Sequence, residues 1–292
     1  MPSISSPDNA RPQDFTRLLD QMAARPTPAV VFYGHDGGRV ELSGRVLENW
    51  VAKTANLLVD DLGLMPGDHV LVDASLHWRT AVVIAAAWRL GAVVVLSGAA
   101  DAPSGAGNGA AASPRTSHPV ELAVIQDPGE AAATSSAAEK AGTLPGVQSA
   151  AEVMALAYPG LAMSLEPERL PAGAIDYCAE IRVHGDQWSG ASRPGPEDVC
   201  LLTPAERLTH ARFFSAAAAL GDQVQAEAIG AVHLDADSWS AVSLERLVAT
   251  WLAGSTAVLT DLSAERPHGG SHEGAEGIGA ILAAERVGLS WS

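Results

Sequence analysis

Apolar and polar positions along residues 29–96 follow a pattern that predicts strands and helices in turn. Short runs of branched apolar residues are typical of buried strands, and apolar residues spaced by three and four predict helices with one buried face. The predicted elements are a strand, a returning strand, a helix, a strand, a helix and a strand, at 29–33, 39–42, 46–58, 70–74, 78–90 and 92–96. Short connections join strands 70–74 and 92–96 to the helix between them, so we expect the two strands to lie parallel in one sheet.

The pattern resumes after residue 118, and one short amphipathic helix is also predicted before the first strand, at 15–22. The remaining predicted elements are strands at 121–125, 231–234 and 256–260 and helices at 131–140, 244–252 and 278–286. Residues 153–156 are compatible with either a strand or a short helix. Alternating strands and helices predict an α/β fold with mainly parallel sheets flanked by helices.

Composition divides the chain into three parts. Residues 1–28 are predicted to form a tail and a helix, 29–262 the α/β domain, and 263–292 a glycine-rich segment with the last helix. Residues 97–118 are rich in Ala, Gly, Ser and Pro without periodicity, so we expect a flexible surface loop. Its closely spaced glycines follow no strand-to-helix corner and therefore predict no phosphate site.

The chain is strongly acidic, with a formal net charge of -16 over 292 residues. Only two of its eighteen basic residues are lysines, Lys53 and Lys140. Nucleic acids and anionic membrane surfaces require a basic patch, so neither is expected as a partner. The charge is typical of a soluble protein.

The N-terminal residues and the two cysteines indicate a cytoplasmic protein. Residues 1–14 lack the basic start and apolar core of a signal peptide, and the longest apolar run, 80–96, is too short and too interrupted to span a bilayer. Cys178 and Cys200 are the only cysteines. We expect two reduced thiols rather than a disulfide or a zinc cluster.

The segment from Val199 to His210 predicts a strand that turns directly into a helix. Residues 199–202 read as a buried strand, and Thr203 is placed to cap a helix that begins at Pro204, with Glu206 completing a T-x-x-E capping box. Such corners often bind phosphate through backbone N–H groups. Here proline has no N–H group, Glu206 adds negative charge, and no glycine allows close approach, so a structural corner is predicted.

Several blocks of sequence resemble one protein family. Residues 42–47 are LSGRVL, 64–70 are LMPGDHV and 78–95 are WRTAVVIAAAWRLGAVVV, which together are similar to the opening of the adenylate-forming enzymes: acyl-CoA synthetases, luciferases and peptide-synthetase adenylation domains. Residues 208–210, LTH, look like the segment that follows the family's phosphate loop. Residues 249–259 are similar to a later helix and strand of the family. The chain resembles a short stand-alone protein related to the N-terminal part of these enzymes.

The departures from the family concern the ATP site. The family's glycine-, serine- and threonine-rich loop with its lysine, of the form TSGTTG-x-PKG, is reduced here to the residues between Thr203 and Leu208. The family's ribose-binding aspartate and C-terminal-domain lysine are expected beyond the end of this sequence, and Lys53 and Lys140 match neither position. The resemblance therefore implies the fold without the residues that bind ATP, and we predict no catalytic residue and no cofactor.

Seven residues are candidates for contacts with a ligand or a metal. Thr203, Thr209 and His210 are the nearest remnants of the family's site, and Asp73 ends a parallel strand, where α/β sheets place ligands. His268, His272 and Glu273 offer two imidazoles and a carboxylate to a divalent metal, although adventitious binding is the simpler interpretation.

Three hypotheses for the function remain open from the sequence. The first is a non-catalytic relative of the acyl-CoA synthetases that binds a partner protein or a small acyl-type ligand. The second is a subunit of a split adenylate-forming ligase that another chain completes, with ATP and Mg²⁺ as cofactors. The third is a structural interaction protein without a ligand. The sequence does not predict the oligomeric state.

Overall fold

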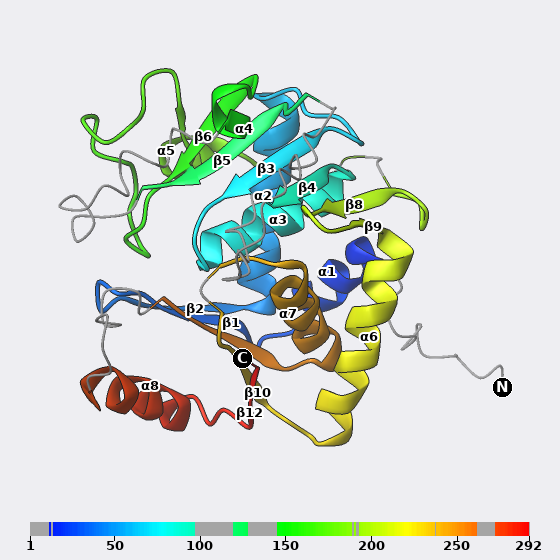
Figure 1. Ribbon diagram of the computed structural model, residues 1–292, viewed down its shortest axis with the longest axis vertical. Helices are drawn as coiled ribbons and strands as arrows, with labels where there is room; N and C mark the ends of the chain where they lie inside the picture. The colour runs from blue at the N-terminus through cyan, green and yellow to red at the C-terminus, as the bar shows by residue number, and fades with distance from the viewer. Residues whose placement is uncertain are drawn as a thin grey trace, which may run out of the picture.

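A computed structural model shows two mainly parallel sheets with helices packed between and around them (Figure 1). The structure describes residues 12, 14–96, 119–127, 145–188, 190, 193–236, 238–261 and 272–291. The α/β fold expected from the sequence is confirmed. The segment at 97–118 and the helix expected at 131–140 lie outside the described residues.

The larger sheet has seven strands, and six of them run parallel. In spatial order they are β7 (Ile175–Asp176), β6 (Glu152–Leu156), β5 (Leu122–Gln126), β3 (His69–Asp73), β4 (Val93–Leu96), β8 (Val199–Leu202) and β9 (Arg207–Thr209). Val70 pairs with Val94 in a parallel register, which confirms the predicted strand–helix–strand unit. Strand β9 pairs with β8 in the antiparallel direction. Residues 152–156 form a strand, which decides between the two alternatives.

The smaller sheet has five strands, and an antiparallel hairpin forms one of its edges. In spatial order they are β12 (Leu289–Trp291), β10 (Ala231–Leu234), β11 (Thr256–Thr260), β1 (Pro28–Tyr33) and β2 (Arg39–Ser43). Strands β1 and β2 are antiparallel, and the other pairs are parallel. Strand β12 was not predicted, because a three-residue apolar run carries too little pattern to separate a strand from a loop.

Two helices lie between the sheets and form the centre of the core (Figure 1). They are α2 (Gly44–Asp60), capped by the Ser43 hydroxyl, and α3 (Trp78–Leu90), which ends at Gly91 with φ 89°. Every residue of α3 is buried, including its two arginines. Only glycine adopts such a φ without strain, which is why the helix stops at this position.

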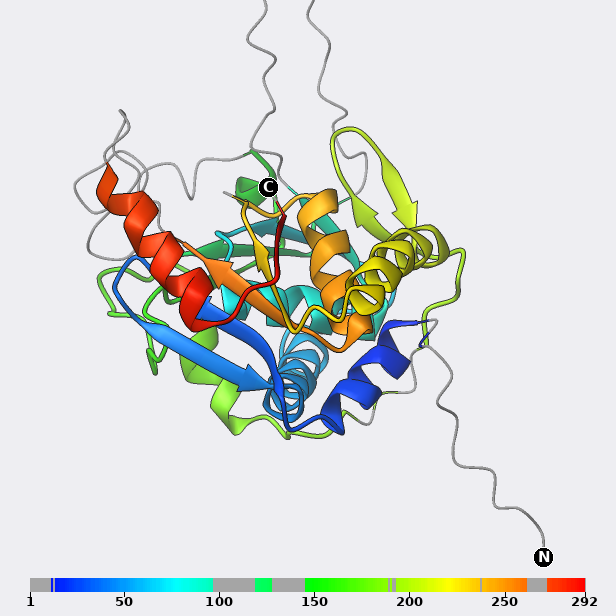
Figure 2. The ribbon, with the colours of Figure 1, turned by 90° about the horizontal axis from the view of Figure 1, so that it is seen from below.

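The remaining helices pack around the sheets. They are α1 (Phe15–Ala23), α4 (Pro145–Gln148), α5 (Tyr177–Glu180) with a short 3₁₀ turn (Ile181–Val183), α6 (His210–Ala226), α7 (Ala241–Ala253) and α8 (His272–Ala284). Helices α6 and α7 lie side by side (Figure 2). None of the helices in the described part of the chain has the length and apolar character that a bilayer span requires.

The prediction that a helix begins at Pro204 is wrong. Thr203 and Glu206 instead close a hairpin between β8 and β9, and α6 begins six residues later at His210. The Thr203 hydroxyl accepts hydrogen bonds from the N–H groups of Ala205 and Glu206, at 3.2 and 3.0 Å. A helix cap would use the same threonine, so the T-x-x-E spacing did not distinguish the two structures.

The true cap of α6 gives a first prediction. The Thr209 hydroxyl accepts a hydrogen bond from the Arg212 N–H at 3.3 Å. Replacing Thr209 with alanine is expected to lower the free energy of unfolding by about 1 kcal/mol, because the N–H group loses its acceptor. Urea denaturation measures the change, with Thr209→Ser as the variant that keeps the hydroxyl. An alanine variant as stable as the serine variant would contradict the cap.

Candidate functional site

The carboxyl ends of parallel strands from the two sheets meet at a common seam. The backbone N–H of His35, just after β1, donates to the Tyr158 hydroxyl, just after β6, at 3.0 Å. Trp239, between β10 and α7, donates from Nε1 to the Ser75 carbonyl, after β3, at 2.8 Å. Ligands of open α/β sheets bind beyond the carboxyl ends of the strands, so this strand-end seam is the candidate site. We define it by His35, Ser75, Gln126, Tyr158, Trp239 and Asp261.

A histidine, a tyrosine and an aspartate form the centre of the strand-end seam. The His35 and Tyr158 rings stack with centroids 3.9 Å apart. His35 Nδ1 lies 3.7 Å from Asp261 Oδ2, and these side chains are 10% and 11% exposed. Burial raises the pKa of Tyr158, and the negative charge and hydrogen bond of Asp261 raise it further, so the hydroxyl stays protonated.

His77 holds the segment that carries Tyr158. Its Nδ1 accepts a hydrogen bond from the Arg79 N–H at 3.0 Å, which leaves Nε2 to donate to the Tyr158 carbonyl at 3.1 Å. Burial, together with the charge of Arg79, holds the pKa of His77 well below its usual value. The imidazole is therefore neutral with its proton on Nε2, and it positions Tyr158 rather than reacting.

Gln126 contributes a buried amide at the end of β5. The Ser75 N–H and hydroxyl both donate to Gln126 Oε1, the former at 3.1 Å, which fixes the orientation of the amide. Nε2 is buried and has no hydrogen-bond partner. Buried polar groups are usually paired, so an unpaired donor beside strand ends is a feature of a binding site or of a buried water.

The predicted ligand residues are distributed over two places. Asp73 ends β3 and lies two residues before Ser75, so the structure places it beside the strand-end seam. Thr203 lies in the hairpin after β8, and β4 separates β8 from β3. Thr209 caps α6, and His210 begins it. The structure thus brings only Asp73 next to the residues that link the sheets.

His210 is a buried packing residue. Its ring contacts Phe15 edge-on at 5.6 Å, and Nε2 has no hydrogen-bond partner. Burial lowers the pKa of His210 to about 4, against the opposing charges of Asp198 and Asp14, so the ring is neutral at pH 7. A buried, neutral ring among aromatic side chains is the environment of a packing residue.

The predicted metal ligands are not placed by the structure. His268 lies outside the described residues, and the side chains of His272 and Glu273, at the start of α8, are likewise not described. In the described ranges, no group of three or more His, Cys, Asp or Glu side chains is arranged to hold a metal ion.

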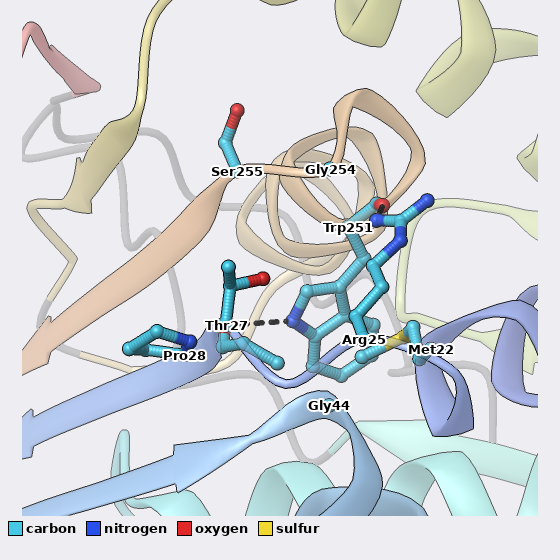
Figure 3. A pocket seen from close by; sticks show the side chains of 9 residues that line it. Met22, Arg25, Thr27, Pro28, Gly44, Trp251, Gly254 and Ser255 are labelled. Atoms are coloured by element: carbon cyan, nitrogen blue, oxygen red, sulfur yellow. Dashed lines mark hydrogen bonds between the residues drawn. The ribbon is translucent and has the colours of Figure 1, made fainter.

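A small cavity lies at the N-terminal end of β1, among Met22, Arg25, Gly44 and Trp251 (Figure 3). Its volume of about 10 Å³ is room for a single water molecule. Arg25 donates to the Trp251 carbonyl at 3.0 Å, near the C-terminus of α7. A Cβ atom on Gly44 would lie 2.3 Å from the Met22 carbonyl oxygen. The residues around the cavity are therefore closely packed, and the cavity is not a ligand site.

Sequence reasoning missed His35, Tyr158 and Asp261. Each stands one or two residues beyond an apolar strand, at 28–33, 152–156 and 256–260. That position was the available signal, and it was applied only to Asp73. The pairing of these three residues could not be anticipated, because it depends on how the two sheets meet.

Solved structures of acyl-CoA synthetases have the same architecture. The acyl-CoA synthetase of Brucella canis superposes on 98% of this chain and 48% of its own, with a TM-score of 0.63 and 18% identity. The chain has the fold of the adenylate-forming enzymes. The N-terminal domain of FACL13 from Mycobacterium tuberculosis matches 96% of this chain and 62% of its own, with a TM-score of 0.60 and 18% identity. A benzoate CoA ligase from Burkholderia xenovorans LB400 matches 94% and 49%, with a TM-score of 0.59 and 16% identity.

One curated relative is similar in sequence. It is a TIGR03089 family protein of Mycobacterium tuberculosis (strain ATCC 25618 / H37Rv), 34% identical over 187 residues, which are 61% of this chain and 63% of the relative. No protein-family model matches the sequence. The chain spans less than two thirds of that relative and about half the length of the full synthetases. The resemblance to acyl-CoA synthetase-like proteins is thus established for the fold.

Proposed function

We propose that this protein is a non-catalytic relative of the acyl-CoA synthetases that binds a small ligand at the strand-end seam in the cytoplasm. The observation that carries the proposal is the closed hairpin at Thr203–Glu206, where the family has its phosphate loop. The two buried, free cysteines, Cys178 and Cys200, support a reducing compartment.

The hairpin uses its own hydrogen-bonding groups. The Thr203 N–H donates to the Glu206 carbonyl at 2.9 Å, and the N–H groups of Ala205 and Glu206 donate to the Thr203 hydroxyl. Pro204 has no N–H group. A phosphate would have to compete with these internal bonds for every donor of the turn, because phosphate loops bind through unpaired backbone N–H groups.

The charge of the hairpin also opposes a phosphate. The Glu206 side chain is 38% exposed, and Arg212 Nη2 lies 3.4 Å from its Oε2. Arg212 is thus engaged by Glu206, which leaves Arg207 as the only cation within the turn and β9 to attract a triphosphate. Loss of several charge-assisted hydrogen bonds, roughly 1.5–3 kcal/mol each, would weaken nucleotide binding by orders of magnitude.

The contrast between the Thr203–Glu206 hairpin and the strand-end seam supports ligand binding without acid activation. The family's phosphate position is closed, whereas the strand-end seam keeps buried polar atoms, Gln126 Nε2 and His35 Nδ1, without partners. Such atoms are costly to bury unless something binds to them. A partner protein at this place is the alternative, and the accessible surface of His35 and Asp261 is small for one.

The test is whether the purified chain binds ATP or activates acids. We expect calorimetric titration with Mg-ATP to show no saturable binding, and pyrophosphate exchange with a panel of carboxylic acids to equal that of a denatured control. An active acyl-CoA synthetase run in parallel verifies both assays. Micromolar ATP binding, or exchange above the denatured control, would overturn the proposal and favour the split-ligase hypothesis.

A further inference from the structure

A histidine inside the smaller sheet is hydrogen-bonded on both of its ring nitrogens. His233 is the third residue of β10, and it is 1% exposed. Its Nδ1 lies 2.8 Å from the Ser290 hydroxyl oxygen on β12, and its Nε2 lies 2.9 Å from the Thr260 hydroxyl oxygen on β11. Three neighbouring strands thus contribute a hydroxyl, an imidazole and a second hydroxyl, which we call the Ser–His–Thr row.

The register of the sheet produces the Ser–His–Thr row. Side chains alternate between the two faces of a strand, so residues two apart share a face. His233 pairs with Ser290 on β12 and with Val258 on β11, and Thr260 stands two residues beyond Val258. The three polar side chains therefore lie on one face, with β10 between β12 and β11. Backbone pairing on both sides fixes the position of the imidazole.

The two hydroxyl groups differ in their access to solvent. Thr260 is 8% exposed, whereas Ser290 is exposed and lies on β12, the strand at one edge of the sheet. Two buried hydroxyls would be enough to satisfy a buried imidazole. In the Ser–His–Thr row one of them instead faces solvent, so a reagent in solution can reach the Ser290 oxygen while the imidazole stays shielded.

The imidazole can act as a base toward Ser290. A hydroxyl both donates and accepts, so the neutral ring can carry its proton on either nitrogen, and the two forms interconvert when the hydroxyls turn. With the proton on Nε2, the Thr260 oxygen accepts it and Nδ1 accepts the Ser290 hydroxyl. A nucleophile, a base within about 2.6–3.2 Å and a third group that orients the base are the arrangement that activates a serine.

We propose that Ser290 is an acyl-acceptor site that reacts with small, uncharged activated esters, with His233 as its general base. Nδ1 takes the hydroxyl proton while the Ser290 oxygen bonds to the ester carbonyl carbon. The bond from that carbon to the leaving-group oxygen then breaks, and this oxygen takes the proton from the imidazolium. One ester forms at Ser290 and one alcohol is released, so no further reactant is required.

The charge of the chain and the place of Ser290 define the class of acyl donor. The formal net charge of -16 repels anionic donors such as acyl phosphates. An exposed edge strand favours a short acyl group, because a long apolar chain gains affinity only from an enclosed apolar surface. The inference goes beyond the proposed function, since a single acylation of Ser290 requires neither ATP nor turnover.

The experiment treats the full chain with p-nitrophenyl acetate and locates the acetyl groups by tandem mass spectrometry of its peptides. Ser215 is the internal control, because it is exposed on α6 and the structure shows no imidazole bonded to it among the described residues. Ser290 is expected to be acetylated roughly 100-fold faster than Ser215, the lower end of the gain from a positioned general base. Equal rates at the two serines would overturn the proposal.

The pH dependence separates a base from a structural contact. The ratio of the Ser290 rate to the Ser215 rate should fall in acid, because a protonated imidazole cannot accept the hydroxyl proton. A ratio that is constant with pH would overturn the role of His233, since a ring that only orders the sheet gives the two serines the same pH profile.

Two variants test the members of the row. His233→Gln keeps a hydrogen-bonding side chain but removes the base, and it is expected to lower the Ser290 rate to that of Ser215. Thr260→Val keeps the base but removes its orienting hydroxyl, and it is expected to lower the rate in part. An unchanged Ser290 rate in a folded His233→Gln variant would overturn the proposal. Should that variant not fold, the wild-type ratio and its pH dependence decide.

Discussion

Replacing Trp88 with alanine is expected to lower the free energy of unfolding by about 3–5 kcal/mol, the largest effect of any single substitution considered for this fold. The side chain is fully buried and stacks on Phe15 with centroids 4.3 Å apart. It also contacts Phe213 at 5.1 Å and donates from Nε1 to the Cys200 carbonyl at 2.9 Å. The substitution therefore opens a cavity where α1, α3, α6 and β8 meet, and it leaves a buried carbonyl without its donor.

The measurement is equilibrium denaturation in urea, with Trp291→Ala as the matched control. Trp291 is the same residue type, lies on the edge strand β12 and is only partly buried. We expect the control to cost less than half as much, because its site is open to water and less contact area is lost. Similar losses at the two positions would show that Trp88 is not central to the core.

The sequence was sufficient for the elements whose pattern is local. The helix expected at 78–90 is observed at those residues, because a mostly apolar segment that ends at a glycine defines both its length and its end. Strand 256–260 is likewise observed where it was expected, and strands 70–74 and 92–96 are each within one residue. Trp78, Trp88 and Trp251 on the predicted helix faces are buried in the core, and Trp50 is partly buried and packs against it.

The sequence was not sufficient to predict the structure where the same local hydrogen bond can form in two alternative structures. Thr203 accepts from the Glu206 N–H in the observed hairpin, and a helix cap would use the same pair of atoms. The pairing of Leu208 with Leu201 decides between them, because it adds a strand to the sheet edge. That choice depends on a neighbouring strand and not on the T-x-x-E spacing.

The strand-end seam could be predicted only in its location. General topology places ligands beyond the carboxyl ends of parallel strands, and Asp73 was identified on that basis. His35 and Tyr158 are separated by 123 residues, so their contact follows from the packing of the two sheets. No spacing in the sequence encodes such a contact.

Replacing Arg79 with methionine is expected to lower the free energy of unfolding by about 2–4 kcal/mol and to loosen the segment that carries Tyr158. The guanidinium is buried on α3 and donates to the carbonyls of Ala157, Pro159 and Ala162 at 2.8, 2.8 and 2.9 Å. It also lies 4.8 Å from the centre of the Trp78 ring. Methionine fills a similar volume, and relief from burying a charge offsets part of the loss, but three carbonyls lose their donor.

Lysine at the same position separates charge from geometry. One ammonium cannot reach three carbonyls that a planar guanidinium spans, so Arg79→Lys is expected to recover only part of the stability. Arg207→Met, at an exposed residue of β9, is the control and is expected to change stability by less than about 0.5 kcal/mol. Urea denaturation gives these values, and amide exchange of residues 157–162 reports the segment directly.

We call the hydrogen bonds of Arg79 to the carbonyls of Ala157, Pro159 and Ala162 the Arg79 clamp. Nitrogen-15 NMR of the His35 ring tests whether this clamp also positions the candidate site. Because Tyr158 is held from one side by the Arg79 clamp and meets His35 and Asp261 on the other, loosening the segment should move the His35 ring in Arg79→Met but not in Arg207→Met. An unchanged His35 spectrum in a destabilised Arg79→Met variant would mean that the clamp stabilises the fold without positioning the seam. Unchanged stability would mean that water replaces the guanidinium at all three carbonyls, and then neither role could be assigned to Arg79.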